Sequence, residues 1–286
     1  MKFNVFTEAQ EFEDKAKPFL TENEDVYSLF YGVLQGIKAG RYENPFMATI
    51  EVNDRIVALF QMTPPHPLNL IIIDETRTDD ILTLAAHELS KRKLPIKSAV
   101  GVKTVVTAFS EKWQETTKCE AKLLMEQGLY RLDQVDQSLE KSPGSWRYAR
   151  KDEAPLLALW FKAFETDTGL KNSPMEAIKE KVNQFLEDEE VFFWEDQGKI
   201  VSMMKKARPS ERGVTVSFVY TPSEERKKGY ARTMVAAGSE ELLKTYDFCV
   251  LYTDMMNPTS NKIYQEIGYR KIADSIHIEF ISEQGL

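Results

Sequence analysis

One stretch in the second half of the chain combines residue types that bind an anionic ligand. Val214, Val216 and Phe218 alternate with polar residues, as in a strand, and Pro222 ends the pattern because proline cannot donate to a strand ladder. From Ala231 onward the apolar residues recur at helical spacing. The sequence therefore predicts a strand, a basic turn and a helix start, which together offer main-chain N–H groups and positive charge to a phosphate.

The turn between this strand and this helix holds one glycine and several cations. Gly229 lets the main chain approach an anion closely, because glycine has no β-carbon. The turn is not a P-loop, since no Gly-Lys-Ser/Thr ends it, and it has only one of the three glycines of the dinucleotide fingerprint. A solvated basic helix start is the alternative interpretation. The cations of the turn are Arg226, Lys227, Lys228 and Arg232.

A second stretch follows this helix and adds a strand and a short helix. Residues 248–253 form a continuous apolar run, which is typical of a strand buried on both faces. Asn257 is a suitable N-cap, Pro258 suits the first helical position, and Gly268 fits the C-cap. A last strand is predicted over 276–280. The order is therefore strand, basic turn, helix, buried strand, short helix and strand.

Together the two stretches resemble the GNAT acetyltransferase superfamily. Its loop pattern, Gln/Arg-x-x-Gly-x-Gly/Ala, stands here as Arg226, Gly229 and Ala231. The later family segment, an Asn followed after six residues by Tyr and then by Gly-Phe/Tyr, is matched by Asn257, Tyr264, Gly268 and Tyr269. Each of the two patterns is common by itself, but both in this order, one helix and one strand apart, are specific.

The resemblance implies acetyl-coenzyme A, or a related acyl-CoA, as the donor and co-substrate, and an amine-bearing small molecule or peptide as the acceptor. The pyrophosphate would lie on the amides of 227–231, and the pantetheine arm between the strands that end at Tyr220 and Thr253. Main-chain amides there would polarise the thioester carbonyl, and Tyr264 would protonate the leaving thiolate as general acid. The residues expected to contact the cofactor are Phe218, Val219, Tyr220, Arg226, Lys227, Lys228, Gly229, Tyr230, Ala231, Arg232, Asn257 and Asn261.

Several roles stay open at this point. Glu165 and Asp167 follow a predicted helix, where this family lines its acceptor site, so either could be the general base; solvated acids and a water relay are the alternatives. For Tyr264 the alternative is an ordinary half-buried helix aromatic. For the whole chain the alternative is a CoA-binding regulatory or interaction module without turnover, with the first half as the partner surface. Tyr264 and a polar loop over 166–173 favour an enzyme.

Composition narrows the class of protein. The net charge of −8 argues against general nucleic-acid binding, which relies on neutralising phosphates, and favours a cationic substrate. Two cysteines, Cys119 and Cys249, exclude a disulfide framework and fit a reducing compartment, so a cytoplasmic location is expected. Three histidines far apart in sequence show no metal spacing, so no metal is expected. A secretory signal and an apolar run of membrane-spanning length are both absent from the sequence, so no membrane contact is expected.

Hydrophobic periodicity predicts the α/β class, with a central mixed β-sheet flanked by helices in each half. In the first half, 12–38 is helical in pattern, and Pro18 is expected to divide it into two helices. A hairpin over 46–62 and a strand over 68–73 follow. The second half repeats this order, with a hairpin over 190–205.

Two sequence matches indicate an internal repeat. Residues 52–58 parallel 196–202 at the turn of each hairpin, and 125–131 parallel 265–270 around a glycine. These matches predict a tandem GNAT-like acyl-CoA N-acyltransferase fold.

The expected domains are a degenerate GNAT-like domain over 1–141 and a GNAT N-acetyltransferase domain binding acyl-CoA over 145–286, joined at a linker over 142–144. The first copy has no glycine over 74–78, and it carries acids where a phosphate would lie. We therefore expect the cofactor in the second copy only.

Overall fold

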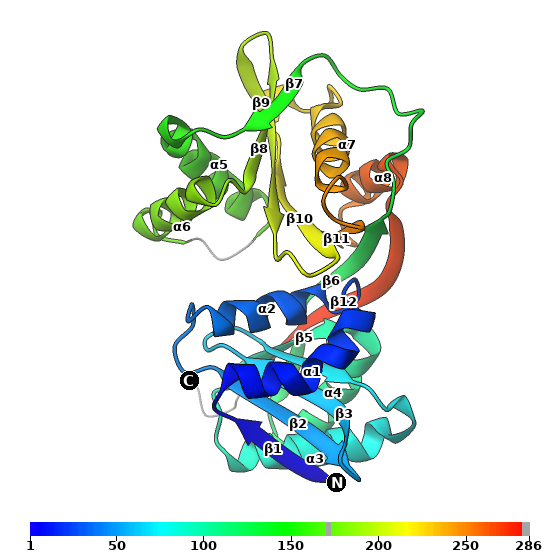
Figure 1. Cartoon of the computed structure of the whole chain (residues 1–286). Helices are drawn as coiled ribbons and strands as arrows, with labels where there is room; N and C mark the ends of the chain where they lie inside the picture. The colour runs from blue at the N-terminus through cyan, green and yellow to red at the C-terminus, as the bar shows by residue number, and fades with distance from the viewer. Residues whose placement is uncertain (170–172, 282–286) are drawn as a thin grey trace. The chain divides into compact units, whose positions relative to one another are not determined.

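The computed structural model describes residues 1–169 and 173–281, which divide into two compact units (Figure 1). Each unit is built on a sheet with helices on both faces. None of the helices in the described residues is long and apolar enough to cross a membrane. Unit 1 contains residues 1–129, 252–257 and 271–281, and unit 2 contains residues 130–251 and 258–270.

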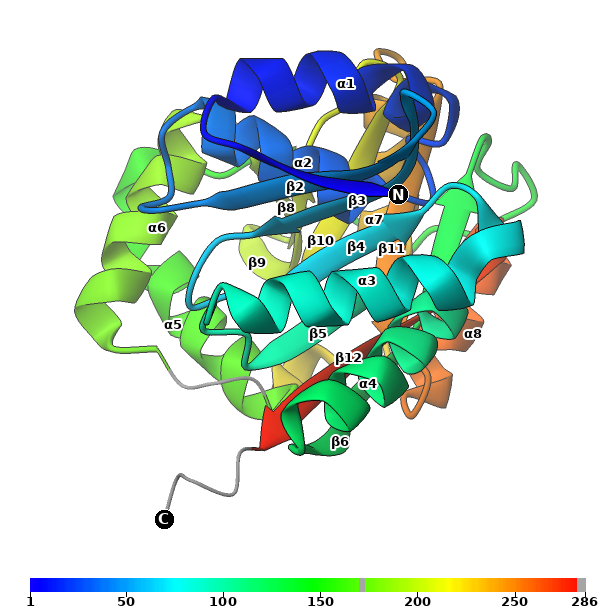
Figure 2. The same cartoon turned by 90° about the horizontal axis from the view of Figure 1, so that it is seen from below.

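The strands of unit 1 follow the order β1-β2-β3-β4-β5-β12. Neighbours in this sheet are antiparallel except β4 and β5, which run parallel and are joined through α3. Helices α1 and α2 cover one face, and α3 and α4 cover the other (Figure 2). The elements of the first repeat are β1 (Lys2–Phe6), α1 (Ala9–Glu22), α2 (Ser28–Lys38), β2 (Phe46–Val52), β3 (Arg55–Met62), β4 (Leu68–Ile72), α3 (Thr78–Lys91), β5 (Ser98–Val102), α4 (Lys103–Thr117) and β6 (Glu120–Leu132).

Strand alternation explains why both faces of this sheet carry helices. Met47 and Leu59 pack with the residues of α1 and α2, whereas their chain neighbours Ala48 and Phe60 pack with those of α3 and α4. All four side chains are buried. Because both faces are apolar, β2 and β3 read as nearly continuous hydrophobic runs, and the sheet needs a helical layer on each side.

The strands of unit 2 follow the order β11-β10-β9-β8-β7, and only β10 and β11 are parallel. Phe192 packs on the side of α7 and α8, and Phe193 on the side of α5 and α6. The elements of the second repeat are β7 (Ser145–Tyr148), α5 (Ala154–Asp167), α6 (Met175–Glu187), β8 (Val191–Asp196), β9 (Lys199–Ala207), β10 (Gly213–Tyr220), α7 (Tyr230–Leu242), β11 (Phe248–Asp254), α8 (Pro258–Ile267) and β12 (Arg270–Ile281).

The order of strands and helices is the same in the two repeats, as the sequence predicted. Their hairpins agree in detail. The turn residues Asn53 and Gln197 have φ of 49° and 48°, and each is followed by another residue with positive φ. Each hairpin also has a register shift just before its turn, after Ile50 in β2 and after Trp194 in β8. The predicted parallel between the two hairpins is therefore structural.

The effect predicted for Pro18 was wrong, because this residue lies inside α1. Phe12, Ala16 and Leu20 recur every fourth residue on the buried face of α1, while Pro18 is exposed. Burial of that apolar face holds the helix together across a residue that lacks one N–H donor. The division between α1 and α2 falls instead at 23–27.

The match around Gly128 and Gly268 is not structural. Gly128 lies inside β6, whereas Gly268 follows α8 with a φ of 114°. The residue of the first repeat that ends the corresponding helix is Lys118, the C-cap of α4, with a φ of 60°. The duplication therefore rests on the element order and the hairpins.

The last strand of the second repeat belongs to the sheet of unit 1. β12 pairs antiparallel with β5, with Ile276 opposite Gly101 and Ile278 opposite Ala99. Ile276, Ile278 and Phe280 are buried in the core on the α3 and α4 side. The compact units consequently differ from the linear division into 1–141 and 145–286, since strand pairing takes 271–281 into unit 1.

Candidate functional site

The strand β10 is irregular at the point where the sequence analysis places the cofactor arm. Ser217 pairs with Lys205 of β9, and Tyr220 pairs with Met203, so β10 has one more residue than β9 between these two pairs. Phe218, which lies between these two pairs, has a φ of 55°. This is a β-bulge, which disrupts the ladder locally and bends the strand.

The parallel pairing of β10 with β11 is limited to its first residues. It covers Gly213 to Thr215, opposite Phe248 to Val250, and in the described part of the chain no further pair between these strands follows. Phe218, Val219 and Tyr220 are all partly exposed. Their main-chain groups therefore lie beyond the β11 ladder, where a ligand could use them.

Aromatic side chains hold the bulge in place from the α5 side of the sheet. The ring of Phe218 lies 4.5 Å from the ring of Phe161 and 4.4 Å from that of Phe164, centroid to centroid. The ring of Tyr220 lies 5.6 Å from that of Trp160. These three partners come from one helix, so α5 fixes the conformation of the strand end.

The segment 226–232, called the anion loop from here on, leads from β10 into α7. Lys227 has a φ of 64°, and Gly229, the N-cap of α7, has a φ of 81°. Among the described residues, no side chain caps the N-terminus of α7. The first turn of this helix therefore offers main-chain N–H groups and the positive end of its dipole to an anion.

Most cations of the anion loop are bound to acids of the protein itself. Arg226 pairs with Asp167, and its Nε donates to the carbonyl of Thr221 at 2.9 Å. Lys228 Nζ lies 2.8 Å from a carboxylate oxygen of Glu225. Arg232 Nη1 lies 3.0 Å from Glu266 Oε2. Three of the four predicted cations are thus paired with acids.

Glu225 is the acid that stabilises the loop from inside. Its side chain is only 7% exposed and accepts hydrogen bonds from Lys199 and Lys228. The hydrogen bond from Lys199 is the largest cause, and that from Lys228 the next, of a pKa of Glu225 below its usual range. A carboxylate that stays ionised beside two lysines organises the loop, so the ligand would depend on main-chain amides more than on free cations.

Tyr230 and Ala231, the two residues after Gly229, begin α7. Tyr230 Oη donates to Asp196 Oδ2 at 2.6 Å, which ties the helix start to the β8–β9 hairpin and raises the pKa of Tyr230. Ala231 has only a methyl group. At both positions the main-chain N–H is the group available to a ligand.

Tyr264 lies on α8 and is 9% exposed. Burial raises its pKa to about 12, so the phenol stays protonated at neutral pH and is a donor, not a base. Its ring is edge-on to that of Tyr269, 6.0 Å away. Asn261, one helical turn earlier, shares this buried face, which places an amide and a phenol side by side along α8.

Asn257 was predicted in the same site, but the structure groups it with unit 1. It directly precedes Pro258, the first residue of α8, and its N–H donates to the carbonyl of Asp254 at 3.0 Å. The predicted cofactor contact of Asn257 stays a prediction.

The two acids considered as general bases have other partners. Glu165 is 5% exposed and accepts from Ser173 N at 2.8 Å and Ser173 Oγ at 2.5 Å. Burial acts to raise the pKa of Glu165, but these hydrogen bonds outweigh it, and the pKa lies below its usual range. Asp167 is bound to Arg226. Each acid therefore has a partner within the protein, and a role as general base stays a prediction for both. Residues 170–172 of the predicted polar loop lie outside the described residues.

The first repeat lacks the bulge at the corresponding place. Asn69, opposite Gln61, corresponds to Ser217, opposite Lys205. From there β4 continues in regular register with β3 to the pair of Ile72 with Ala58. After β4, the side chain of Asp74 accepts from Thr76 N at 3.1 Å. A carboxylate therefore occupies the turn before α3, where the second repeat offers amides.

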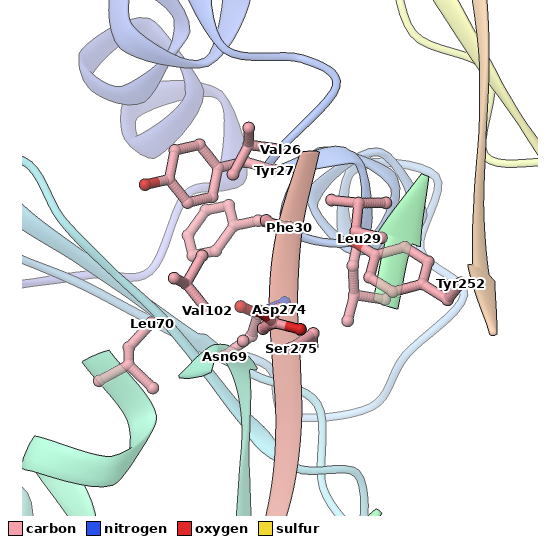
Figure 3. A pocket seen from close by; sticks show the side chains of 13 residues that line it. Val26, Tyr27, Leu29, Phe30, Asn69, Leu70, Val102, Tyr252, Asp274 and Ser275 are labelled. Atoms are coloured by element: carbon pink, nitrogen blue, oxygen red, sulfur yellow. The ribbon is translucent and has the colours of Figure 1, made fainter. Parts of the chain in front are cut away.

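A small pocket of unit 1 lies where β4 and β5 separate (Figure 3). Its volume is about 20 Å³, which is enough for one water molecule. Side chains from the start of α2, including Leu29 and Phe30, and Ser275 of β12 line it. The pocket is small and β4 is regular, in contrast to the bulged β10. That the cofactor binds to the second repeat only stays a prediction.

We expect acetyl-CoA to protect the anion loop and leave 74–78 unprotected. In hydrogen exchange with and without the ligand, amides of 226–232 should exchange more slowly when it is bound, because they donate to the pyrophosphate. Amides of the first-repeat turn should exchange equally in both samples, since Asp74 and its neighbours repel a phosphate. Protection at 74–78 alone would contradict the assignment of the site to unit 2.

The chain is similar to solved structures that are described as acetyltransferases. A family model described as FR47-like protein matches residues 197–278, and no curated protein matches the chain. An acetyltransferase of the GNAT family from Colwellia psychrerythraea is 13% identical, with a TM-score of 0.61, over 99% of this chain and 100% of that chain. A GCN5-related N-acetyltransferase from Sphaerobacter thermophilus is 12% identical, with a TM-score of 0.62, over 98% and 96%. A tandem GNAT protein from the clavulanic acid biosynthesis pathway is 10% identical, with a TM-score of 0.59, over 97% and 98%.

These matches show the fold of the chain. The chain has the tandem GNAT fold, with two repeats of one α/β unit, and its second repeat contains the FR47-like segment. The fold class and the resemblance to the GNAT superfamily predicted from the sequence are confirmed.

Some residues of the site had no signal in the sequence. Glu225 is one acid among many until Lys199 and Lys228 are seen to meet it. Phe161 and Phe164 read as core residues of a helix, and their contact with Phe218 depends on the bulge.

Proposed function

We propose that the protein is an N-acetyltransferase that moves an acetyl group from acetyl-CoA to a primary amine, with unit 2 as the cofactor-binding unit. The observation that carries this proposal is the bulged end of β10 leading into an α7 N-terminus without a side-chain cap, headed by Gly229. Phosphate groups bind at such helix starts. The likeness of the fold to solved acetyltransferases supports the same assignment.

In this proposal each part of the site has one task. The pyrophosphate lies on the amides of 227–231, and main-chain groups of Phe218 to Tyr220 contact the pantetheine arm and the thioester carbonyl. Lys227 supplies charge, because no ion pair involves it in the described part of the chain. Glu225 and Tyr230 hold the loop in place through Lys199, Lys228 and Asp196.

The reaction is direct transfer. The amine nitrogen attacks the thioester carbon, so a C–N bond forms and the C–S bond breaks, with its electron pair leaving on sulfur. Tyr264 donates its phenolic proton toward that sulfur, and the amine loses a proton to a base or water. An acyl-enzyme on Cys249 is disfavoured, because this thiol is fully buried and burial raises its pKa to about 12.

The acceptor is an amine-bearing small molecule or peptide. A net charge of −8 favours a cationic acceptor over an anionic one. The general base is unassigned, since Glu165 and Asp167 both have partners of their own.

The proposal is tested by CoA release. Purified protein, acetyl-CoA and a panel of amines are incubated, and free CoA thiol is measured with a thiol reagent. Cys119 is partly exposed and reacts with such reagents, so protein without amine gives the baseline. Release that depends on an amine, with the acetylated amine identified by mass spectrometry, is expected. Tight CoA binding without turnover for any amine would favour the regulatory module, and absence of CoA binding would overturn both.

A further inference from the structure

The connection between the repeats, residues 133–144, is bound along unit 2 and does not hang free between β6 and β7. We call it the connecting segment. The carbonyl of Glu140 accepts from Arg232 at 3.3 Å, and Lys141 pairs with Glu240 at 2.5 Å. The carbonyl of Pro143 accepts from Trp194 Nε1 at 2.9 Å. Two of these partners belong to α7, so the segment follows the helix that starts at the anion loop.

Within this segment, Ser142 contacts the anion loop itself. Its N–H donates to Thr233 Oγ1 at 2.8 Å, and its Oγ donates to the carbonyl of Lys228 at 2.9 Å. Thr233 is fully buried, and its N–H donates to the carbonyl of Gly229 at 3.0 Å. With two hydrogen bonds, Ser142 thus joins the peptide before Gly229 to the first turn of α7.

The space beside Gly229 is taken by the same hydroxyl. A β-carbon at this position would lie 2.7 Å from Ser142 Oγ. Apart from the glycine and its chain neighbours, no other atom of the described residues would be within 4 Å. Gly229 is therefore needed for two reasons, its φ of 81° and the approach of Ser142. The absence of a side chain leaves room for the connecting segment as well as for a phosphate.

The C-terminal end of the connecting segment is also fixed, through Gly144 and Pro143. Gly144 has a φ of 117°, and a β-carbon there would lie 2.4 Å from the carbonyl oxygen of Glu195. Only a glycine at position 144 therefore allows the chain to pass so close to β8. With Pro143 bound to Trp194, the residues around Ser142 are held on both sides.

We propose that Ser142 is a positioning residue of the cofactor site. It holds the peptide between Lys228 and Gly229 so that the N–H groups at the start of α7 keep the orientation that binds the pyrophosphate. The connection between the repeats thereby becomes part of the cofactor site of unit 2. This inference rests on the proposed function, because it takes CoA as the ligand of the anion loop.

The first test measures CoA binding by calorimetry for wild type, Ser142→Ala, Ser142→Thr and Ser138→Ala. Ser142→Ala is expected to weaken binding about three- to ten-fold, which corresponds to the loss of one neutral hydrogen bond. Ser142→Thr keeps the hydroxyl and should bind CoA like wild type. Ser138 lies in the same segment but bonds to Asp136, so Ser138→Ala is the matched control and should leave the dissociation constant unchanged.

Two further readouts separate positioning from general stability. With a working acceptor, Ser142→Ala should raise KM for acetyl-CoA and leave kcat unchanged, because it removes no contact to the reacting atoms. In the free protein, amides of 226–232 should exchange faster in Ser142→Ala than in Ser138→Ala.

The second test is a double-mutant cycle with Gly229→Ala. The new methyl must displace Ser142 Oγ, so this single variant already loses the contact. Adding Ser142→Ala should then cause no additional loss of CoA affinity, and the two effects should be clearly non-additive.

The outcomes distinguish the two proposals. If wild type does not bind CoA, the proposed function fails. If wild type binds and Ser142→Ala binds equally, or if Ser142→Thr is as weak as Ser142→Ala, the proposed function stands and the role of Ser142 is overturned. The role of Ser142 would also be overturned if Ser142→Ala lowered CoA affinity by the same factor in wild type and in Gly229→Ala.

Discussion

Tyr264→Phe is expected to reduce turnover by about 10²–10⁴, the usual contribution of a positioned general acid. The change removes one hydroxyl and keeps the ring, which is 9% exposed and packs edge-on against Tyr269. Packing of α8 should therefore change little. CoA affinity should also change little, because the proposed pyrophosphate contacts lie on the anion loop.

The environment of Tyr264 decides how this proton can be used. A phenol with a pKa of about 12 is a weak acid toward a thiol in water, whose pKa is about 8.5. Burial raises thiol pKa values as well, and Cys249 in the same core reaches about 12. Desolvation of the departing thiolate would act in the same direction and bring its proton affinity closer to that of Tyr264.

The pH dependence follows from the sign of this shift. The useful form of Tyr264 is the protonated one, which is present below its pKa and is lost as pH rises through about 12. Near neutral pH, Tyr264→Phe should therefore lower the whole pH–rate profile without changing its shape. An alkaline limb in this range belongs to another group.

Tyr269→Phe is the matched control for this experiment. Tyr269 is 2% exposed, and its hydroxyl shares a 2.8 Å hydrogen bond with Ser239. Its loss should reduce thermal stability and leave kcat unchanged. If Tyr264→Phe turns over any accepted amine at the wild-type rate, Tyr264 has no part in the reaction and is an ordinary core aromatic.

Gly229→Glu is expected to weaken CoA binding by at least about 100-fold, or about 2.7 kcal/mol. The substitution places a side chain and a negative charge where the pyrophosphate approaches, and it forces a β-carbon into a φ of 81°. Both effects act against the same main-chain amides. Calorimetric titration with CoA gives the dissociation constant directly.

Gly40→Glu separates this effect from backbone strain and added charge. Gly40 follows α2 in unit 1 and has a φ of 68°. Apart from this glycine and its chain neighbours, no atom of the described residues would lie within 4 Å of a β-carbon there. It should reduce stability and leave CoA affinity as in wild type. Unchanged CoA affinity in folded Gly229→Glu would reject the anion loop as the cofactor site.

Local sequence patterns predicted many elements of both repeats, although the first strand, β1, was missed. The hairpin of β2 and β3 has the predicted bounds, because period-2 alternation and turn residues act within a few positions. The helix start at α7 and the short α8 were found from Gly229, Pro258 and Gly268 for the same reason. Pro18 failed as a break, since burial of one face of α1 outweighed a local propensity.

The amino-acid sequence by itself determined the class of fold, the order of elements and the residues that offer amides, charge and a phenol. The tertiary structure alone decided which of those groups are engaged. Lys228 is bound by Glu225, Arg232 is turned to Glu266, and Ser142, 86 residues before Lys228, closes on the anion loop. The bulge in β10 and the pairing of β12 with β5 were likewise decided by the tertiary structure. Contacts between residues so far apart in the chain depend on packing of whole layers, which no local pattern encodes.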